Sequence, residues 1–218
     1  MKHPTKRTLP ATHRPGRLIV LEGGEGAGKS THAKFVCEWL GQQGRKAVLT
    51  REPGGSPLAE AIRELVLRSW KEGMEPTTEL LLMFAARAAH LHALIRPALE
   101  GGRDVICDRF VDATYAYQGA GRGLRETDID ALAELVLRRL RPDLVLVLDV
   151  DPATGARRVR GRGAANRFDE EAMAFQARVR KAYLRRAARD PKRYVVIDAE
   201  REQPAVRADI ERALEALR

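Results

Sequence analysis

The stretch Gly23-Gly24-Glu25-Gly26-Ala27-Gly28-Lys29-Ser30 matches the phosphate-binding pattern G-x-x-x-x-G-K-[ST] at every fixed position. An apolar run, Leu18 to Leu21, precedes it, and a segment with helical periodicity follows it. A glycine-rich turn lets successive backbone N–H groups point at a phosphate, and the following helix adds its positive end. Lys29 is expected to reach the outer phosphates, and the Ser30 hydroxyl to bind a magnesium ion. The stretch therefore predicts a site for a nucleoside triphosphate.

Length and composition favour one domain. The chain has 218 residues, of which 44% are hydrophobic, enough for one sizeable core. Its two cysteines have no metal-ligand spacing. Residues 1–16 are basic, carry three prolines and lack the apolar stretch of a signal peptide, so we expect a disordered tail there and a single domain over 17–218. Charges interrupt the longest apolar runs, which favours a cytoplasmic protein without a membrane span.

The formal charge of +9 raises the question of nucleic-acid binding. The arginines are spread along the chain, however, and few aromatic residues lie between them, which is not typical of a nucleic-acid surface. Small phosphorylated ligands explain clustered arginines equally well. We therefore expect no nucleic-acid partner.

Apolar runs alternate with helical patterns along the chain. The expected strands are 17–22, 46–51, 104–107, 143–150 and 194–198, and the expected helices are 29–42, 57–70, 76–99, 126–140, 169–189 and 204–217, with further helix signals from Pro152. A loop is expected around Tyr115, Tyr117 and Gln118, and a mobile surface segment rich in arginine, glycine and alanine over 157–167. This alternation predicts an α/β fold of the phosphate-loop NTPase type, with a five-stranded parallel sheet covered by helices on both faces.

The phosphate loop alone does not separate a kinase from an ATPase, a GTPase or a helicase. The sequence lacks the N-K-x-D pattern that reads guanine, and no apolar strand ends in paired acids that would position an attacking water. Asp108 instead ends a strand and is followed at once by Arg109. This pair places a carboxylate for magnesium beside a guanidinium suited to a second phosphate.

Three blocks, the first of which contains the phosphate loop, make the chain resemble the thymidylate kinase family of the bacterial type, over nearly everything from Arg17 to Leu217. They are Glu22-Gly23-Gly24-Glu25-Gly26-Ala27-Gly28-Lys29-Ser30-Thr31, Thr50-Arg51-Glu52-Pro53-Gly54-Gly55, and Asp108-Arg109-Phe110 followed by Ala116-Tyr117-Gln118-Gly119. The resemblance implies magnesium-dependent transfer of the γ-phosphoryl group of ATP to dTMP.

The resemblance also implies roles for individual residues. Gly23, Gly24, Glu25, Gly26, Ala27, Gly28, Lys29, Ser30 and Thr31 would bind ATP, Ser30 and Asp108 would bind magnesium, and Lys29 and Arg109 would act in catalysis. For dTMP, Arg51 and Arg109 would hold the phosphate, and Glu25 would approach the sugar 3′-hydroxyl or the phosphate. Arg87 would face the thymine carbonyl, and Tyr117 would occupy the place of a ribose 2′-hydroxyl. Gln118 would contact the acceptor.

Arginines at 157, 158, 160 and 162 lie where the family has its lid, about 157–168. The family has a form with a catalytic arginine in the phosphate loop and a form with it in the lid. Gly24 to Ala27 contains no arginine, so the lid form fits. Arg160 and Arg162, which glycines flank, are the better candidates for the catalytic role.

Two places depart from the family pattern. The aromatic residue that stacks on thymine usually lies four residues before the arginine matching Arg87, where this chain has Met83, and we expect Phe84 to take over the stacking. The second departure is the stretch Asn166-Arg167-Phe168-Asp169. The family tends to have an acidic residue at the first of these four positions and a glutamate at the fourth.

Two other functions remain open from the sequence: a kinase of another nucleotide or nucleoside, and a phosphate-loop ATPase that acts on nucleic acid. A homodimer is also expected, partly because the family forms one. The helix from Thr77 to Leu99 supports this, since it carries more apolar residues than one core-facing stripe requires, namely Leu80, Leu81, Leu82, Ala85 and Ala89.

Overall fold

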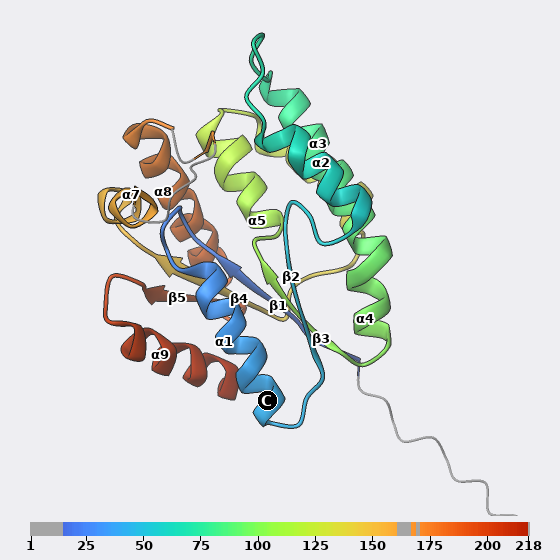
Figure 1. Ribbon diagram of the computed structural model, residues 1–218, viewed down its shortest axis with the longest axis vertical. Coiled ribbons are helices and arrows are strands. Elements are labelled where there is room, and N and C mark those ends of the chain that lie inside the picture. Colours follow the sequence, from blue (N-terminus) through green and yellow to red (C-terminus); the bar gives the residue numbers. More distant parts are fainter. Residues whose placement is uncertain (1–14, 161–166, 169–170, 218) are drawn as a thin grey trace, which may run out of the picture.

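A parallel five-stranded sheet forms the centre of the computed structural model, which describes residues 15–160, 167–168 and 171–217. The strands are β1 (Leu18–Glu22), β2 (Ala47–Arg51), β3 (Asp104–Asp108), β4 (Leu144–Asp149) and β5 (Tyr194–Asp198). Their order is β2-β3-β1-β4-β5, and all four neighbouring pairs are parallel (Figure 1). The predicted sheet is therefore confirmed. The tail expected over residues 1–16 lies outside the described residues up to residue 14.

Helices cover both faces of this sheet (Figure 1). They are α1 (Lys29–Gln42), α2 (Pro57–Leu67), α3 (Pro76–His90), η1 (Leu91–Ile95), α4 (Arg96–Glu100), α5 (Val111–Thr114), η2 (Tyr115–Gly121), α6 (Glu126–Leu137), α7 (Pro152–Arg160), α8 (Met173–Arg189) and α9 (Gln203–Ala216). Helices α1 and α9 pack on one face, and α3, η2 and α8 pack on the other.

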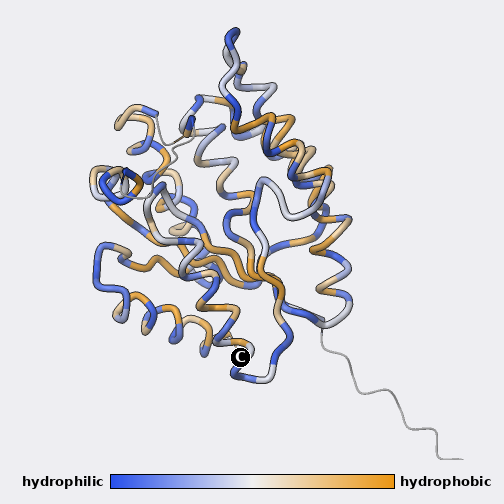
Figure 2. Tube along the Cα trace, in the orientation of Figure 1, coloured by the Kyte–Doolittle hydropathy of each residue, from blue (hydrophilic) through white to orange (hydrophobic). Residues whose placement is uncertain are grey.

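Strand β1 shows why both faces are apolar. Leu18 and Val20 belong to the core on the α3 and α8 side, whereas Ile19 and Leu21 belong to the core on the α1 and α9 side. Alternate residues of a strand point to opposite faces, so a central parallel strand needs an unbroken apolar run. The strands accordingly form the most hydrophobic part of the trace (Figure 2).

One uninterrupted helical stretch, Pro76–Glu100, runs through α3, η1 and α4. Its 25 residues include an 18-residue window with a mean hydropathy of 1.2, which suffices by length and composition for a membrane span, but half of that window is buried inside the protein. Glu79, Arg87 and His90 are almost fully buried on it. Its apolar character is thus accounted for by the core of a folded domain.

Residues 115–121 correct the expectation of a loop. They form η2, which continues α5, and the two expected site residues in it, Tyr117 and Gln118, are buried. A Cβ on Gly121 would lie 2.6 Å from the Phe175 ring, so the glycine lets this helix approach α8 closely. Gly121, one of the glycines that indicated a loop, instead serves helix packing.

Two helix ends also differ from the expectation. Arg157 to Arg160 lie in α7, so the first part of the expected mobile segment is helical, while residues 161–166 lie outside the described residues. Helix α2 ends at Leu67 rather than at Trp70. The Trp70 indole donates to the Leu65 carbonyl (3.0 Å), which satisfies one of the free carbonyl groups of that helix end.

Candidate active site

Three strands end beside one another at the carboxyl edge of the sheet. Parallel pairing places Leu21 of β1 and Arg51 of β2 on either side of Asp108 of β3. The phosphate loop follows β1 directly and leads into α1. Because β1 is the central strand, the loop and both arginine-bearing strand ends share one edge, where ligands of such sheets bind.

The phosphate loop has the conformation that its glycines permit. Gly23, Gly26 and Gly28 have φ values of 139°, 73° and 84°. A Cβ on Gly26 would lie 2.2 Å from the Gly155 carbonyl oxygen, so a side chain there would force α7 away. Lys29 Nζ donates to the Gly24 carbonyl (2.7 Å) and thus lies folded over the loop. Burial, followed by repulsion from Arg109, lowers the pKa of Lys29 to about 8.

The two expected magnesium ligands lie within hydrogen-bonding distance. Ser30 Oγ donates to Asp108 Oδ2 at 2.6 Å, although the two residues are 78 positions apart in the chain. No group of three or more His, Cys, Asp or Glu side chains that could hold a metal occurs among the described residues. A hydroxyl and one carboxylate suit magnesium, which keeps several waters and takes further ligands from substrate phosphates.

Arg109 is held by four groups. Its guanidinium donates to the Gly23 carbonyl (2.9 Å) and to the hydroxyls of Tyr183 (3.0 Å) and Tyr117 (2.9 Å), and it pairs with Glu25 Oε1 (2.6 Å). The backbone of Arg109 has a φ of 70°, unusual for a residue other than glycine. Such strain persists where the surroundings fix the residue, and it is common at functional sites.

Three adjoining cavities lie along this edge. The central one, of about 150 Å³, is lined by the phosphate loop and by Arg51, Glu52, Arg63, Asp108 and Arg109. An outer one, of about 370 Å³, extends from Gly26, Thr31 and Arg158 to residues 199–203. A smaller one, of about 110 Å³, continues from Glu25, Glu52, Arg63 and Arg109 to Met83, Tyr117, Gln118 and Phe168. Cationic side chains therefore surround the central cavity, and the smallest cavity beside it has a less polar wall.

The smallest cavity has a different apolar wall from the one we expected. Met83 lines it, whereas Phe84 is not among its lining residues. Phe84 is 2% exposed and lies in the core, with its ring 4.9 Å from the guanidinium carbon of Arg87. Phe168 completes the wall and meets Tyr117 edge to face at 5.7 Å.

Four buried side-chain atoms among the described residues have no hydrogen-bond partner: His32 Nδ1, Arg87 Nη1, Thr114 Oγ1 and Gln118 Oε1. The rest of Arg87 is fixed, since Nε pairs with Glu52 (2.7 Å) and Nη2 donates to the Phe110 carbonyl (3.0 Å). Gln118 Nε2 donates to Glu79 (2.7 Å). Buried polar atoms are seldom left unpaired, and two of these four residues line cavities of the site: His32 lines the outer one and Gln118 the smallest one.

The structure also places the remaining arginines that the sequence singled out. Arg51 lines the central cavity and donates to Glu60 (2.9 Å). Arg160 is exposed at the end of α7, and Arg162 lies outside the described residues. Arg158, which was the weaker lid candidate, donates to the Ala199 carbonyl (2.8 Å) and lines the outer cavity.

Sequence reasoning missed Arg63, Phe168 and residues 199–203. No motif contains Arg63, and only the helical spacing of α2 indicates which way it faces. Its guanidinium donates to the Pro53 carbonyl (2.7 Å), beside the family-specific block that the sequence did provide.

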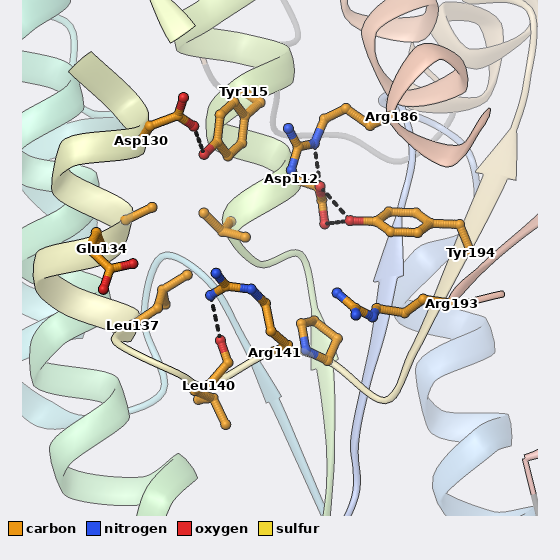
Figure 3. Close-up of a pocket in the computed structure, with 13 residues that line it drawn as sticks. Asp112, Tyr115, Asp130, Glu134, Leu137, Leu140, Arg141, Arg186, Arg193 and Tyr194 are labelled. Atoms are coloured by element: carbon orange, nitrogen blue, oxygen red, sulfur yellow. Dashed lines mark hydrogen bonds and ion pairs between the residues drawn. The ribbon is translucent and has the colours of Figure 1, made fainter. Parts of the chain in front are cut away.

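A further cavity of about 400 Å³ lies away from this edge, between α5, α6, α8 and the start of β5 (Figure 3). It contains none of the expected site residues. Asp112 accepts hydrogen bonds from Arg186 and Tyr194, and Asp130 accepts one from Tyr115 (2.6 Å). Much of its charge is thus paired within its own walls.

Fold and cavities together define a phosphotransferase of the phosphate-loop class, because a triphosphate and a second ligand would meet between Lys29 and Arg109. The family model described as thymidylate kinase matches residues 21–210. Thymidylate kinase of Chromohalobacter salexigens is 58% identical over 198 residues, which cover 90% of this chain and 93% of that relative. That of Pseudomonas entomophila is 54% identical and covers 93% and 94%.

The crystal structure of thymidylate kinase from Ehrlichia chaffeensis is also similar. It has a TM-score of 0.76 and 33% sequence identity, over 92% of this chain and 100% of that one. This chain belongs to the thymidylate kinase family. It is an ATP-dependent nucleoside monophosphate kinase.

Proposed function

We propose that this protein transfers the γ-phosphoryl group of ATP to dTMP and releases dTDP. ATP occupies the outer cavity, with its phosphates along residues 23–31, and dTMP occupies the smallest cavity. The acceptor phosphate then lies in the central cavity beside Arg51 and Arg109. Two like-charged phosphates must approach there, and the surrounding cations offset their repulsion.

The observation that carries this proposal is the unpartnered Gln118 Oε1 of the smallest cavity, together with the unpartnered Nη1 of Arg87, whose Nε pairs with Glu52 of the same cavity wall. Arg87 Nη1 is a donor and Gln118 Oε1 is an acceptor, and both are buried. Thymine presents a carbonyl acceptor at O4 next to a donor at N3–H. Cytosine presents the reverse, a donor amino group next to an acceptor nitrogen. A thymine-type base needs a donor that faces O4 and an acceptor that faces N3–H, and we assign these places to Arg87 and Gln118.

Specific side chains carry the remaining steps. Lys29 and Arg109 stabilise the charge that develops on the transferred group, and Glu25 holds Arg109 and lies close enough to the acceptor to orient it. When magnesium is bound, it neutralises phosphate charge and would be held through Ser30 and Asp108. We assign the base contact to Met83 rather than to Phe84, because Met83 lines the cavity.

The arginines after Pro152 complete the ATP site. Arg158 faces the outer cavity and is placed to contact the nucleotide. Arg160 and Arg162 remain our candidates for the catalytic arginine of the lid, which extends over about 157–168. Since Arg160 is exposed at the end of α7, its catalytic role requires the lid to close over the phosphates.

We also propose that the enzyme is a cytoplasmic homodimer, without a nucleic-acid or membrane partner. Leu81, Ala85 and Ala88 are exposed on α3 at spacings of four and three residues, which places them on one face of that helix. Leu58 and Leu65 are exposed on α2, which packs against α3. Such a surface suits a self-complementary interface.

An acceptor panel tests the proposed reaction. ATP and magnesium are combined with dTMP, dUMP, UMP, CMP, AMP, GMP or thymidine, and the products are identified by mass. We expect dTDP as the main product and the highest kcat/KM for dTMP. A preference for another acceptor would replace dTMP in the proposal. ATP turnover that requires DNA and falls steeply with salt would favour the nucleic-acid ATPase instead.

A further inference from the structure

Glu22 is a fully buried carboxylate at the end of β1, immediately before the phosphate loop. The proposed reaction assigns it no contact with ATP or dTMP. Its Oε1 accepts hydrogen bonds from the backbone N–H groups of Phe110 (2.7 Å) and Ala113 (3.3 Å), and its Oε2 accepts one from the Tyr183 hydroxyl (2.9 Å). Burying a carboxylate is costly, so three hydrogen bonds to one group indicate a specific task.

The first two of these hydrogen bonds hold the backbone that follows Arg109. Phe110 comes directly after Arg109, whose φ of 70° turns the chain from β3 into α5. Ala113 lies in that helix. Because Glu22 is bound to both N–H groups, it fixes the turn in which Arg109 takes its unusual conformation.

The third hydrogen bond reaches the guanidinium. Arg109 Nη1 donates to the Tyr183 hydroxyl (3.0 Å), which in turn donates to Glu22 (2.9 Å). A matching relay lies on the other side, where Arg109 Nη2 donates to the Tyr117 hydroxyl (2.9 Å) and that hydroxyl donates to Glu25 (2.9 Å). Arg109 is thus held between two tyrosine–carboxylate pairs, of which only the second lies at the proposed dTMP site.

We propose that Glu22 and Tyr183 form a positioning pair that fixes both the backbone and the guanidinium of Arg109 for phosphoryl transfer. This inference rests on the proposed function, because it takes Arg109 as the cation between the two phosphates. Both residues act through Arg109 and touch neither substrate.

The ionisation of Glu22 should affect this pair. Burial, followed by the negative charge of Asp112, raises the pKa of Glu22 to about 7. The titratable groups that interact with Glu22 are Lys29, Cys107, Arg109, Asp112, Tyr183 and Tyr194. Proton uptake below about pH 7 would remove one acceptor from the relay and loosen Arg109.

Steady-state kinetics of Tyr183→Phe, Glu22→Gln and the double variant test the pair. We expect kcat with dTMP to fall about ten- to a hundredfold in each single variant, the range for hydrogen bonds to charged groups, while the KM for ATP stays within about twofold. Because the two residues act as one unit, the double variant should be no slower than the slower single variant. The parent rate should fall more steeply below about pH 7 than the rate of Glu22→Gln, because the substrate phosphates titrate near this range with both enzymes whereas Glu22 titrates only in the parent.

Tyr115→Phe is the matched control. It also removes a phenolic hydroxyl, which donates to Asp130 and to no part of the Glu22 relay, so its kcat should stay within about twofold of the parent value. Circular dichroism and thermal unfolding establish that each variant is folded. If Glu22→Gln does not fold, Tyr183→Phe is combined with Arg109→Lys. The double variant should then have the same kcat as Arg109→Lys alone, since the guanidinium that the Tyr183 hydroxyl positions is gone.

The outcomes separate the two proposals. A parent enzyme that does not phosphorylate dTMP would overturn the proposed function. A parent that is active, with Tyr183→Phe and Glu22→Gln equally active, would overturn the positioning pair. Independent, additive losses in the double variant would overturn it as well.

Discussion

At the scale of the residue, the site depends on cations that are held in place before substrate arrives. Arg109 makes four contacts through its guanidinium, and Lys29 is folded onto the Gly24 carbonyl. A preorganised cation needs little rearrangement when charge develops on the transferred phosphoryl group, which is why it lowers the barrier effectively.

Replacement of either cation should therefore abolish useful turnover. We expect Lys29→Ala and Arg109→Ala to lower kcat about a hundred- to a thousandfold, corresponding to ~2.7 to 4 kcal/mol for one such group. Lys34→Ala is the control, because Lys34 is exposed on the same helix as Lys29. Rates of the two site variants within threefold of the parent would contradict the assignment.

Deoxyribose selectivity should reside in the ring of Tyr117. This side chain is 5% exposed, lines the smallest cavity and is packed against Phe168, and we propose that it fills the space that a 2′-hydroxyl would need. Tyr117→Ala should lower the ratio of kcat/KM for dTMP to that for its ribose counterpart by at least about tenfold, since apolar pockets alone discriminate poorly against a hydroxyl.

Tyr117→Phe separates the ring from its hydroxyl. It keeps the ring but loses the hydrogen bonds to Glu25 and Arg109, so its rate should fall while the selectivity ratio stays near the parent value. An unchanged ratio in Tyr117→Ala would show that selectivity comes from elsewhere.

At the scale of the element, a buried charge cluster joins three segments around the smallest cavity. Glu79 of α3 is fully buried, accepts from Gln118 of η2 and pairs with Arg122 (3.4 Å) and Arg167 (2.6 Å). Gly121 lets η2 lie close to α8, since a Cβ there would meet the Phe175 ring. The cluster therefore fixes Gln118, whose Oε1 is left unpartnered.

Removal of Glu79 should destabilise the fold strongly. Glu79→Ala leaves two arginines without their shared carboxylate, and breaking a buried ion pair in this way costs ~3 to 5 kcal/mol of unfolding free energy. Glu126→Ala is the control, because its partners Arg185 and Arg189 are about half exposed and the loss should stay below ~1 kcal/mol. Urea unfolding measures both, and equal losses would contradict the prediction.

At the scale of the whole molecule, the exposed leucines on α2 and α3 predict association. Light scattering at micromolar concentration should give about twice the monomer mass of 24.3 kDa. Leu81→Glu places a charge where the side chain is 52% exposed, so it should yield a folded monomer. Leu135→Glu is the control, since Leu135 is 72% exposed on α6. A parent mass near 24.3 kDa would exclude the homodimer.

The sequence by itself determined the sheet, the phosphate loop and the strand ends that carry Arg51 and Asp108. These features follow from local patterns: apolar runs predict buried strands, and parallel strands bring their carboxyl ends to one edge. The resemblance to the family then supplied the substrates. All of this could be predicted because each signal lies within a few neighbouring residues.

Only the tertiary structure decided which side chains form the walls of the site. Met83 and Phe84 are adjacent and both apolar, so helical periodicity does not say which one faces the cavity and which one enters the core. Glu22 and Tyr183 are 161 residues apart, and no local pattern links them. Their contact arises because α8 packs against β4 and β5 on the sheet face that also carries the end of β1, and packing between distant segments is not encoded in the periodicity of either one.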